Sequence, residues 1–139
     1  MSDDFQHFFE TVRRPAASAF VAGDSAPVVR LSVQAGQATF FDPGGGFTEG
    51  AEAINRANRE GAAHFGPTGK TELQVKDLAQ SGDLAFWTGF QMAEVDAGGE
   101  RQSMRLRVTE IFRHEADGWK MVHRHASPAA GKAEESGAG

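Results

Sequence analysis

Three ionisable side chains near the end of the chain are spaced so that they could share one site. Residues 103–113 alternate apolar and polar side chains, and Glu110 stands in the apolar row. A tight turn centred on 116–117 would pair this strand with the next one and place Glu110 opposite His123. His125 follows two residues along the same face. A carboxyl group and two imidazoles on an otherwise apolar face are groups that can exchange protons.

Two interpretations of this cluster stay open. A buried polar group costs a few kcal/mol unless it is paired, so a hydrogen bond between Glu110 and His123 could serve stability alone. Alternatively, the groups line a pocket whose apolar surroundings raise the pKa of Glu110 and let it donate a proton. Two histidines at strand spacing are weak evidence for a metal, and we expect neither a metal nor a cofactor.

A second carboxylate of interest ends a short β-prone segment. Asp42 follows residues 38–41 and precedes a proline and three glycines, the strongest turn signal in the chain. A carboxylate at a strand end can overlook the mouth of a cavity and act as a base. Asp-Pro-Gly is also a common turn sequence, in which the aspartate only binds its own backbone. Both interpretations of Asp42 stay open.

The elements that would position these residues are helices in the first half of the chain and strands in the second. Spacing and capping residues predict helices over 5–13, 16–22, 26–33 and 51–64, with a break at Pro15 and with Thr48 capping the last helix. Alternation predicts strands from residue 70 onward, over 84–95, over 103–113 and over 119–127. This order is typical of an α+β fold, with about four helices packed on a strongly curved antiparallel sheet that encloses a pocket.

The strand over 84–95 supplies further predicted contacts with a ligand. Its Phe86, Thr88, Phe90 and Met92 share one face, which we favour as the inner one, although the loose Gly-Gly hairpin leaves the choice open. Trp87 would then cover the outer face, where a second copy of the chain would hide it. The sequence therefore predicts a homodimer. The predicted ligand-binding residues are Thr88, Phe90, Trp87, Trp119 and His125.

Composition limits the kind of protein this is. The chain has 139 residues, no cysteine and a net charge of -5, which excludes disulfides and disfavours a nucleic-acid partner. No apolar run approaches the length of a membrane span, and the acidic N-terminus lacks the features of a signal peptide. We expect one cytoplasmic domain over residues 1–127, followed by a disordered tail over 128–139.

Several motifs resemble a known superfamily. The segment Ala38-Thr39-Phe40-Phe41-Asp42-Pro43-Gly44, followed by Gly50 and Ala53-Ile54, resembles ketosteroid isomerases of the SnoaL-like, nuclear-transport-factor-like superfamily. The stretch from Asp117-Gly118-Trp119 to Ser127 is also similar to the association domain of calmodulin-dependent kinase. The resemblance implies a cystatin-like cone. It also implies a general base at Asp42 and a protonated carboxylic acid at Glu110. The isomerase tyrosine would fall near Ala16, and the chain contains no tyrosine.

The function expected from this resemblance is binding of a small molecule, with proton transfer on a small apolar carbonyl substrate as the enzymatic form. Asp42 would take the proton, and Glu110 with His123 would stabilise or reprotonate the oxyanion. The alternative is a non-catalytic association module or ligand carrier, because the superfamily's fold does not fix its function.

Overall fold

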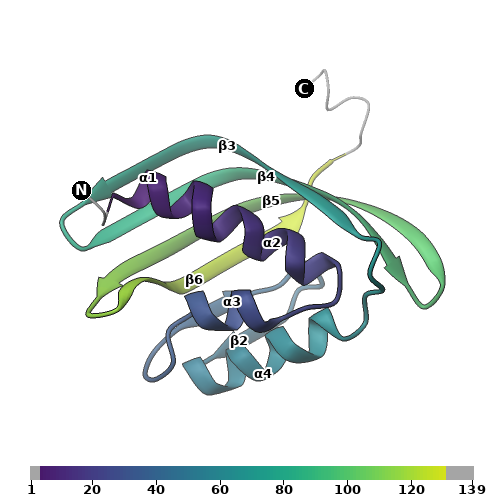
Figure 1. The fold of residues 1–139 in the computed structure, drawn as a ribbon, viewed down its shortest axis with the longest axis horizontal. Coiled ribbons are helices and arrows are strands. Elements are labelled where there is room, and N and C mark those ends of the chain that lie inside the picture. Colours follow the sequence, from purple (N-terminus) through teal and green to yellow (C-terminus); the bar gives the residue numbers. More distant parts are fainter. Residues whose placement is uncertain (1–3, 131–139) are drawn as a thin grey trace.

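Six strands form one mixed sheet (Figure 1). The structure is a computed structural model that describes residues 4–130. The strands are β1 (Thr39–Phe41), β2 (Phe47–Glu49), β3 (Lys70–Ser81), β4 (Leu84–Ala97), β5 (Glu100–Glu115) and β6 (Gly118–Pro128), in the spatial order β2-β1-β6-β5-β4-β3. β1 runs parallel to β6, and the other neighbouring pairs are antiparallel. The predicted α+β class is confirmed, with one parallel pair that the sequence did not indicate.

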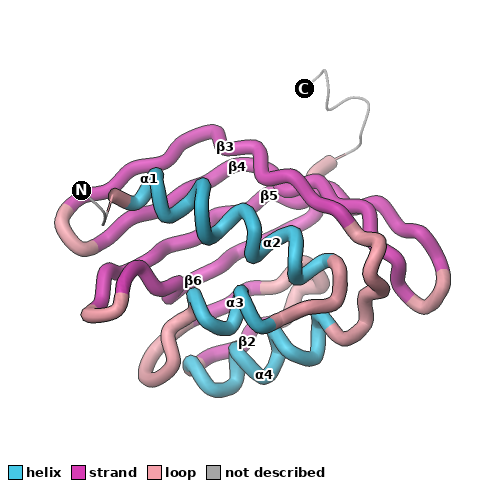
Figure 2. The backbone as a smooth tube through the Cα atoms, in the orientation of Figure 1, coloured by secondary structure: helices cyan, strands magenta, loops and turns pink. Residues whose placement is uncertain are grey.

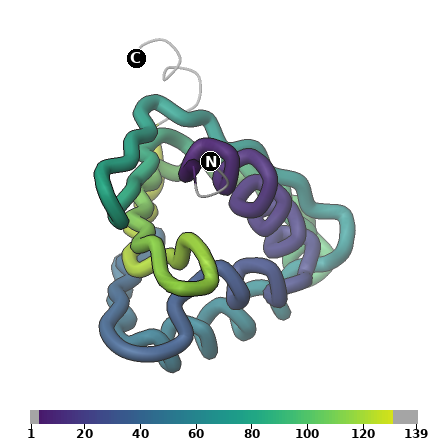
Figure 3. Tube along the Cα trace, turned by 60° about the vertical axis from the view of Figure 1, so that its left-hand side comes forward, coloured from purple at the N-terminus to yellow at the C-terminus, as the bar shows by residue number. Residues whose placement is uncertain are grey.

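The helices cover one face of this sheet, which we call the inner face (Figure 2). They are α1 (Phe5–Phe8), the π-helical turn η1 (Phe9–Arg13), α2 (Arg14–Val21), α3 (Ala26–Leu31) and α4 (Ala51–Ala62). α1, η1 and α2 follow one another without a break and form one continuous helix. With α3 and α4, the described residues therefore contain three separate helices, where about four were expected. The sheet curls around them, and Figure 3 shows strands and helices surrounding a common interior. No helix in residues 4–130 is long and apolar enough to cross a membrane.

Pro15 does not end the first helix, contrary to the prediction. A proline inside a helix lacks the N–H donor, and its ring collides with the carbonyl four residues earlier. The chain widens the turn before it, so that the amide of Arg14 donates to the carbonyl of Phe9, five residues back. The extra residue in this turn shifts the helical phase. Arg13 is buried, whereas Val12, whose spacing from Phe8 and Phe9 predicts the same buried face in a regular helix, is 41% exposed.

The strand β4 turns the opposite face inward from the one that we favoured. Trp87 is completely buried and Gln91 nearly so, whereas Thr88 and Phe90 lie on the outer face and are half-buried. Burial removes more apolar surface from water for an indole than for a phenyl ring. The indole N–H also finds an acceptor inside, the carboxylate of Glu110. The expectation that Thr88 and Phe90 face inward is therefore wrong.

A β-bulge changes the register on which the predicted cluster depended. The observed pairs are Phe112 with Met121, Ile111 with His123 and Glu110 with Arg124. The first pair matches the prediction, but Val122 is an extra residue in β6, and beyond it every pair is shifted by one. Because neighbouring residues of a strand point to opposite faces, His123 lies on the other side of the sheet from Glu110. The predicted pair of Glu110 with His123 is wrong.

Two chain segments differ in smaller ways from the prediction. Thr48 was expected to cap the fourth helix, but it lies in β2, and Gly50 with a φ of 94° precedes α4 instead. Such a positive φ suits glycine, which has no Cβ to collide. The predicted disordered tail, 128–139, lies outside the described residues from 131 onward. Its first residue, Pro128, still belongs to β6.

Candidate functional site

A cavity of about 270 Å³ lies between the helices and the inner face of the sheet. Most of its lining is apolar and comes from both layers, including Phe20, Val28, Ile54, Phe65, Leu106 and Met121. An apolar cavity of about 150 Å³ is enough to hold benzene. This cavity therefore has room for a small organic molecule.

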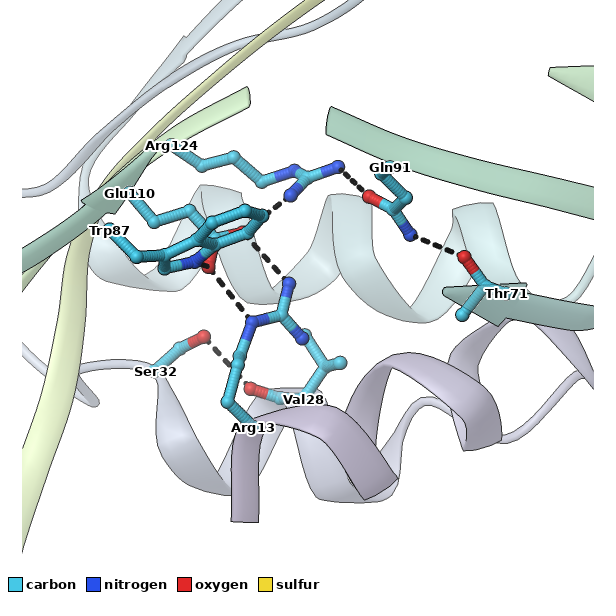
Figure 4. A network of polar contacts seen from close by, with 8 residues as sticks. All are labelled: Arg13, Val28, Ser32, Thr71, Trp87, Gln91, Glu110 and Arg124. Atoms are coloured by element: carbon cyan, nitrogen blue, oxygen red, sulfur yellow. Dashed lines mark hydrogen bonds and ion pairs between the residues drawn. The ribbon is translucent and has the colours of Figure 1, made fainter. Parts of the chain in front are cut away.

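Polar side chains gather on the cavity wall where three elements meet. Arg13 comes from η1, Gln91 from β4 and Arg124 from β6, and all three line the cavity. Figure 4 shows Arg13 and Arg124 joined through Glu110, which comes from β5 and is not part of the lining, and Gln91 joined to Arg124. A mostly apolar pocket with a few convergent polar groups is the usual form of a small-molecule site. We take this wall as the candidate site.

Glu110 is the centre of the network and is completely buried. Arg13 makes a bidentate contact with its carboxylate, in which Nε donates to Oε1 and Nη2 donates to Oε2, both at 2.8 Å. The indole Nε1 of Trp87 donates to Oε1 at 2.7 Å, and Nη1 of Arg124 donates to Oε2. The two guanidiniums and the indole therefore occupy both carboxylate oxygens.

These contacts decide the protonation state of Glu110. Burial alone would raise its pKa, because a charge is poorly solvated in the interior. The charge and hydrogen bonds of Arg13, then the charge of Arg124 and the bond from Trp87, outweigh burial and lower the pKa to about 2. Glu110 is therefore an ionised carboxylate at neutral pH. The sequence analysis offered a raised pKa for Glu110 that would make it a proton donor, whereas its contacts in the structure lower the pKa.

The network continues from Arg124 toward the edge of the sheet. Nη2 of Arg124 donates to Oε1 of Gln91 at 2.9 Å, and Nε2 of Gln91 donates to the hydroxyl of Thr71 at 3.1 Å. That hydroxyl in turn donates to the carbonyl of Met92 at 2.8 Å. The chain of bonds fixes the orientation of the Gln91 amide and holds the guanidinium of Arg124 at the cavity wall.

Asp42 is held by its own turn. Its Oδ1 accepts from the amides of Gly44 and Gly46 at 2.9 and 3.0 Å, the arrangement expected for an aspartate that closes a turn. A Cβ at Gly46 would approach Oδ2 of Asp42 to 2.5 Å, so the glycine makes room for the carboxylate. Pro43 lines the cavity, but Asp42 is not part of the lining. The turn interpretation therefore accounts for the contacts of this carboxylate.

The two histidines of the predicted cluster lie beside β1, at the far side of the bulge. Nδ1 of His123 is 2.8 Å from the hydroxyl of Thr39, and the rings of both His123 and His125 lie near that of Phe41. Burial, and then the charge of His125, lower the pKa of His123, although the charge of Glu110 acts in the other direction. His123 is among the residues at the cavity lining, although its ring is turned toward Thr39 and Phe41, and His125 is exposed.

The remaining predicted ligand contacts lie away from the cavity lining. Trp87 donates to Glu110 behind the wall, and Trp119 packs against the ring of Phe5, 5.3 Å away between centroids. On the outer face, the Thr88 hydroxyl donates to the carbonyl of Val108, and the guanidinium of Arg105 lies 4.4 Å from the Phe90 ring centroid. Among residues 4–130, no group of three or more histidines, cysteines or carboxylates is arranged to hold a metal ion.

Arg13, Gln91 and Arg124 are the site residues that the sequence analysis missed. Arg13 had a signal, since it follows Phe5 and Phe9 at intervals of four and so continues the buried stripe of the helix. Gln91 also had one, because it shares a strand face with Trp87. Arg124 had none, because only the bulge turns it inward.

Comparisons with known proteins agree with this fold. A profile of the SnoaL-like domain matches residues 16–131. The chain therefore belongs to the SnoaL-like domain family, whose fold here encloses a ligand-sized cavity. No curated protein matches the chain closely enough in sequence to count as a relative.

Three solved structures illustrate the similarity. A provisionally assigned dehydratase of the NTF2-like family from Streptomyces avermitilis is 21% identical with a TM-score of 0.74, over 94% of this chain and 97% of that one. A provisionally assigned calmodulin-dependent kinase II association domain from Thiobacillus denitrificans is 20% identical with a TM-score of 0.69, over 86% and 94%. A provisionally assigned ketosteroid isomerase from Parabacteroides distasonis is 18% identical with a TM-score of 0.66, over 92% and 90%. Because the sequence identities are this low, the similarity to these three structures shows a shared fold and no more.

Proposed function

We propose that this protein binds a small, largely apolar molecule in the cavity between its helices and its sheet. The observation that carries the proposal is the cavity itself, about 270 Å³ with apolar walls and one polar side. Its form supports the proposal too, because a largely apolar cavity with a few convergent polar groups is the usual form of a small-molecule site.

The catalytic roles predicted for Asp42, Glu110 and His123 stay predictions, and the contacts favour binding over proton transfer. A general base and a general acid must reach one substrate at hydrogen-bond distance. The carboxylate of Asp42 is bonded to its own turn, and that of Glu110 is saturated by Arg13, Arg124 and Trp87. His123 lies across the sheet from Glu110.

A cavity-filling variant tests the binding proposal. Ala57 lines the cavity from α4, whereas Ala53 on the same helix does not. We expect phenylacetamide, a neutral probe with an apolar ring, to shift backbone amide signals of cavity residues in NMR spectra of the wild type. Ala57→Leu should abolish those shifts and Ala53→Leu should preserve them. Shifts that persist unchanged in Ala57→Leu would show that the probe binds elsewhere, and no shifts in the wild type would contradict the proposal.

A second candidate function is association with another copy of the chain through the outer face of the sheet. Phe41 and Phe47 are 40% and 52% exposed there, and their rings stack 4.9 Å apart. Exposed apolar patches often mark interaction sites. The structural likeness to a kinase association domain supports a homodimer as well. A cytoplasmic location, expected from the composition, stays a prediction.

Sedimentation velocity over a range of concentrations tests this association. Phe47→Ser should move the wild-type dimer toward monomer. Val12→Ser removes a similarly exposed apolar side chain from the helical side, 41% exposed, and should leave the dimer intact. A wild-type chain that sediments as a monomer at all concentrations would end the proposal of a homodimer.

A further inference from the structure

One nitrogen of the buried network has no partner. Arg13 is 4% exposed, and its Nε and Nη2 are bonded to Glu110, but its Nη1 finds no hydrogen-bond acceptor within the described residues. Figure 4 shows this third nitrogen turned away from the carboxylate. A buried N–H without an acceptor is costly, and more so when it carries charge. Because Arg13 also lines the cavity, a ligand there can supply the acceptor.

The charges around the cavity point to the sign of that ligand. Arg13 and Arg124 share the single carboxylate of Glu110, which leaves one positive charge in excess. Among the described residues that line the cavity, the ionisable ones are Arg13, Arg124 and His123, and none is a carboxylate. A positive charge held in surroundings of low dielectric attracts an anion more strongly than it would in water.

The rest of the lining points to the body of the ligand. The walls around this polar side are aliphatic and aromatic, with Phe20, Ile54 and Phe65 among them. The other polar side chains there have partners, since the Ser32 hydroxyl donates to the carbonyl of Val28 and Asn58 donates to Asn55. A simple inorganic anion would leave these apolar walls without contacts, whereas an organic acid would use both parts of the cavity.

We propose that the ligand of this cavity is an apolar carboxylic acid, bound as its carboxylate at Nη1 of Arg13 beside Arg124. This inference rests on the proposed function and narrows its ligand class. The carboxylate accepts from the free N–H of Arg13 and balances the excess charge, while the apolar part fills the space between α4 and the sheet. Planar guanidiniums suit carboxylates because their N–H groups form a rigid fork.

Calorimetric titration with three matched probes tests the proposal. Phenylacetate carries the ring and the charge, phenylacetamide has the same shape without the charge, and acetate has the charge without the ring. We expect phenylacetate to bind the wild type about tenfold or more tightly than either of the other two. Binding of acetate as tight as that of phenylacetate would mean that the cavity is only an anion site, and would overturn the proposal.

Gln91→Glu is the sharpest variant. A glutamate at this position keeps an oxygen for Nη2 of Arg124, and its second oxygen can accept from the Thr71 hydroxyl once that proton turns away from the Met92 carbonyl. Its added negative charge cancels the excess positive charge at the wall. We expect the preference for phenylacetate over phenylacetamide to disappear, because phenylacetate loses far more affinity than phenylacetamide does. Gln74→Glu makes the same substitution at an exposed position of β3 and should change neither affinity.

A second variant addresses Arg13 directly. Arg13→Lys keeps a positive charge for Glu110 but removes the free nitrogen, so phenylacetate should bind about tenfold more weakly, and phenylacetamide, which carries no charge, should lose less affinity. Equal affinity of the wild type for phenylacetate and phenylacetamide would overturn the acid preference and leave the proposed binding function intact. Failure of both to bind would contradict the proposed function itself, and the acid proposal with it.

Discussion

The inner and outer faces of the sheet hold their polar groups in opposite ways. On the inner face, Glu110 and Arg13 are withdrawn from water and bonded to each other. On the outer face, the hydroxyls of Thr88 and Thr109 bond to each other where both residues are only half-buried, and His125 is exposed. Charges interact strongly in the interior and are screened at the surface. The contribution of a polar residue of this sheet to the free energy of unfolding therefore depends on the face that it occupies.

One inserted residue decides which face receives which side chain. Without the bulge at Val122, the alternation that places Met121 inside would carry on to His123 and His125. With it, Arg124 and Ala126 turn inward instead, and Ala126 is completely buried. The bulge therefore replaces two titratable imidazoles on the inner face with a permanent cation at the cavity wall.

The largest expected effect comes from removing the charge at the centre of the inner face. Glu110→Gln leaves the buried Arg13 and the half-buried Arg124 without a counter-charge, and breaking a buried pair costs about 3–5 kcal/mol. Urea denaturation should show this loss in the free energy of unfolding. Thr109→Val, one residue away on the outer face, removes only a hydroxyl bonded to Thr88 and should cost about 1 kcal/mol or less. Equal losses in the two variants would mean that the faces do not differ as described.

The dependence of stability on pH sharpens the same contrast. Folding lowers the pKa of Glu110 from 4.5 to about 2, so its ionised form stabilises the folded state. This contribution, about 3 kcal/mol, is fully present above pH 4.5 and is lost as the pH falls toward 2. The difference in unfolding free energy between the wild type and Glu110→Gln should therefore shrink over this range. A difference that stays constant from pH 6 to pH 2 would contradict the lowered pKa.

The fold could be predicted from the sequence to a large extent, because its signals are local. Period-two alternation located β4, β5 and β6 to within a few residues, and glycine clusters marked the turns between them. The helices were also located, apart from the continuation through Pro15. That continuation depends on a π-turn, which the helix propensities of the neighbouring residues do not predict.

The site could be predicted only in part, because it depends on which faces meet. Glu110 was found as a polar residue in an apolar row, and it is indeed the centre of the network. Its partners were not found: Arg13 was overlooked although its spacing from Phe5 and Phe9 indicated it, and Arg124 is turned inward only by the bulge. The π-turn and the bulge are each a one-residue insertion in a regular element, and such an insertion changes the phase of everything that follows.

A smaller effect is expected at the histidines. The charge of His125 helps to lower the pKa of His123, so His125→Asn should raise that pKa toward the ordinary value of about 6.5. Because folding lowers the pKa of His123, protonation of this group destabilises the folded state, and the variant should weaken that effect as the pH falls. NMR titration of the His123 ring protons measures the shift directly. A pKa of His123 that moves with Glu110→Gln but not with His125→Asn would favour the register that the structure excludes.

The smallest expected effect separates a turn residue from a general base. Asp42→Asn keeps the Oδ1 that accepts from Gly44 and Gly46, so the free energy of unfolding should change by less than about 0.5 kcal/mol. Binding of phenylacetate and of phenylacetamide should be unchanged, because Asp42 does not line the cavity. Asp42→Ala removes both bonds and should cost about 1 kcal/mol, again without an effect on binding. A contrary outcome would be a reaction that Asp42→Asn abolishes while the fold and the binding of the acid persist. The carboxylate would then have to leave its turn during turnover. The general base predicted from the sequence would be the correct interpretation of Asp42.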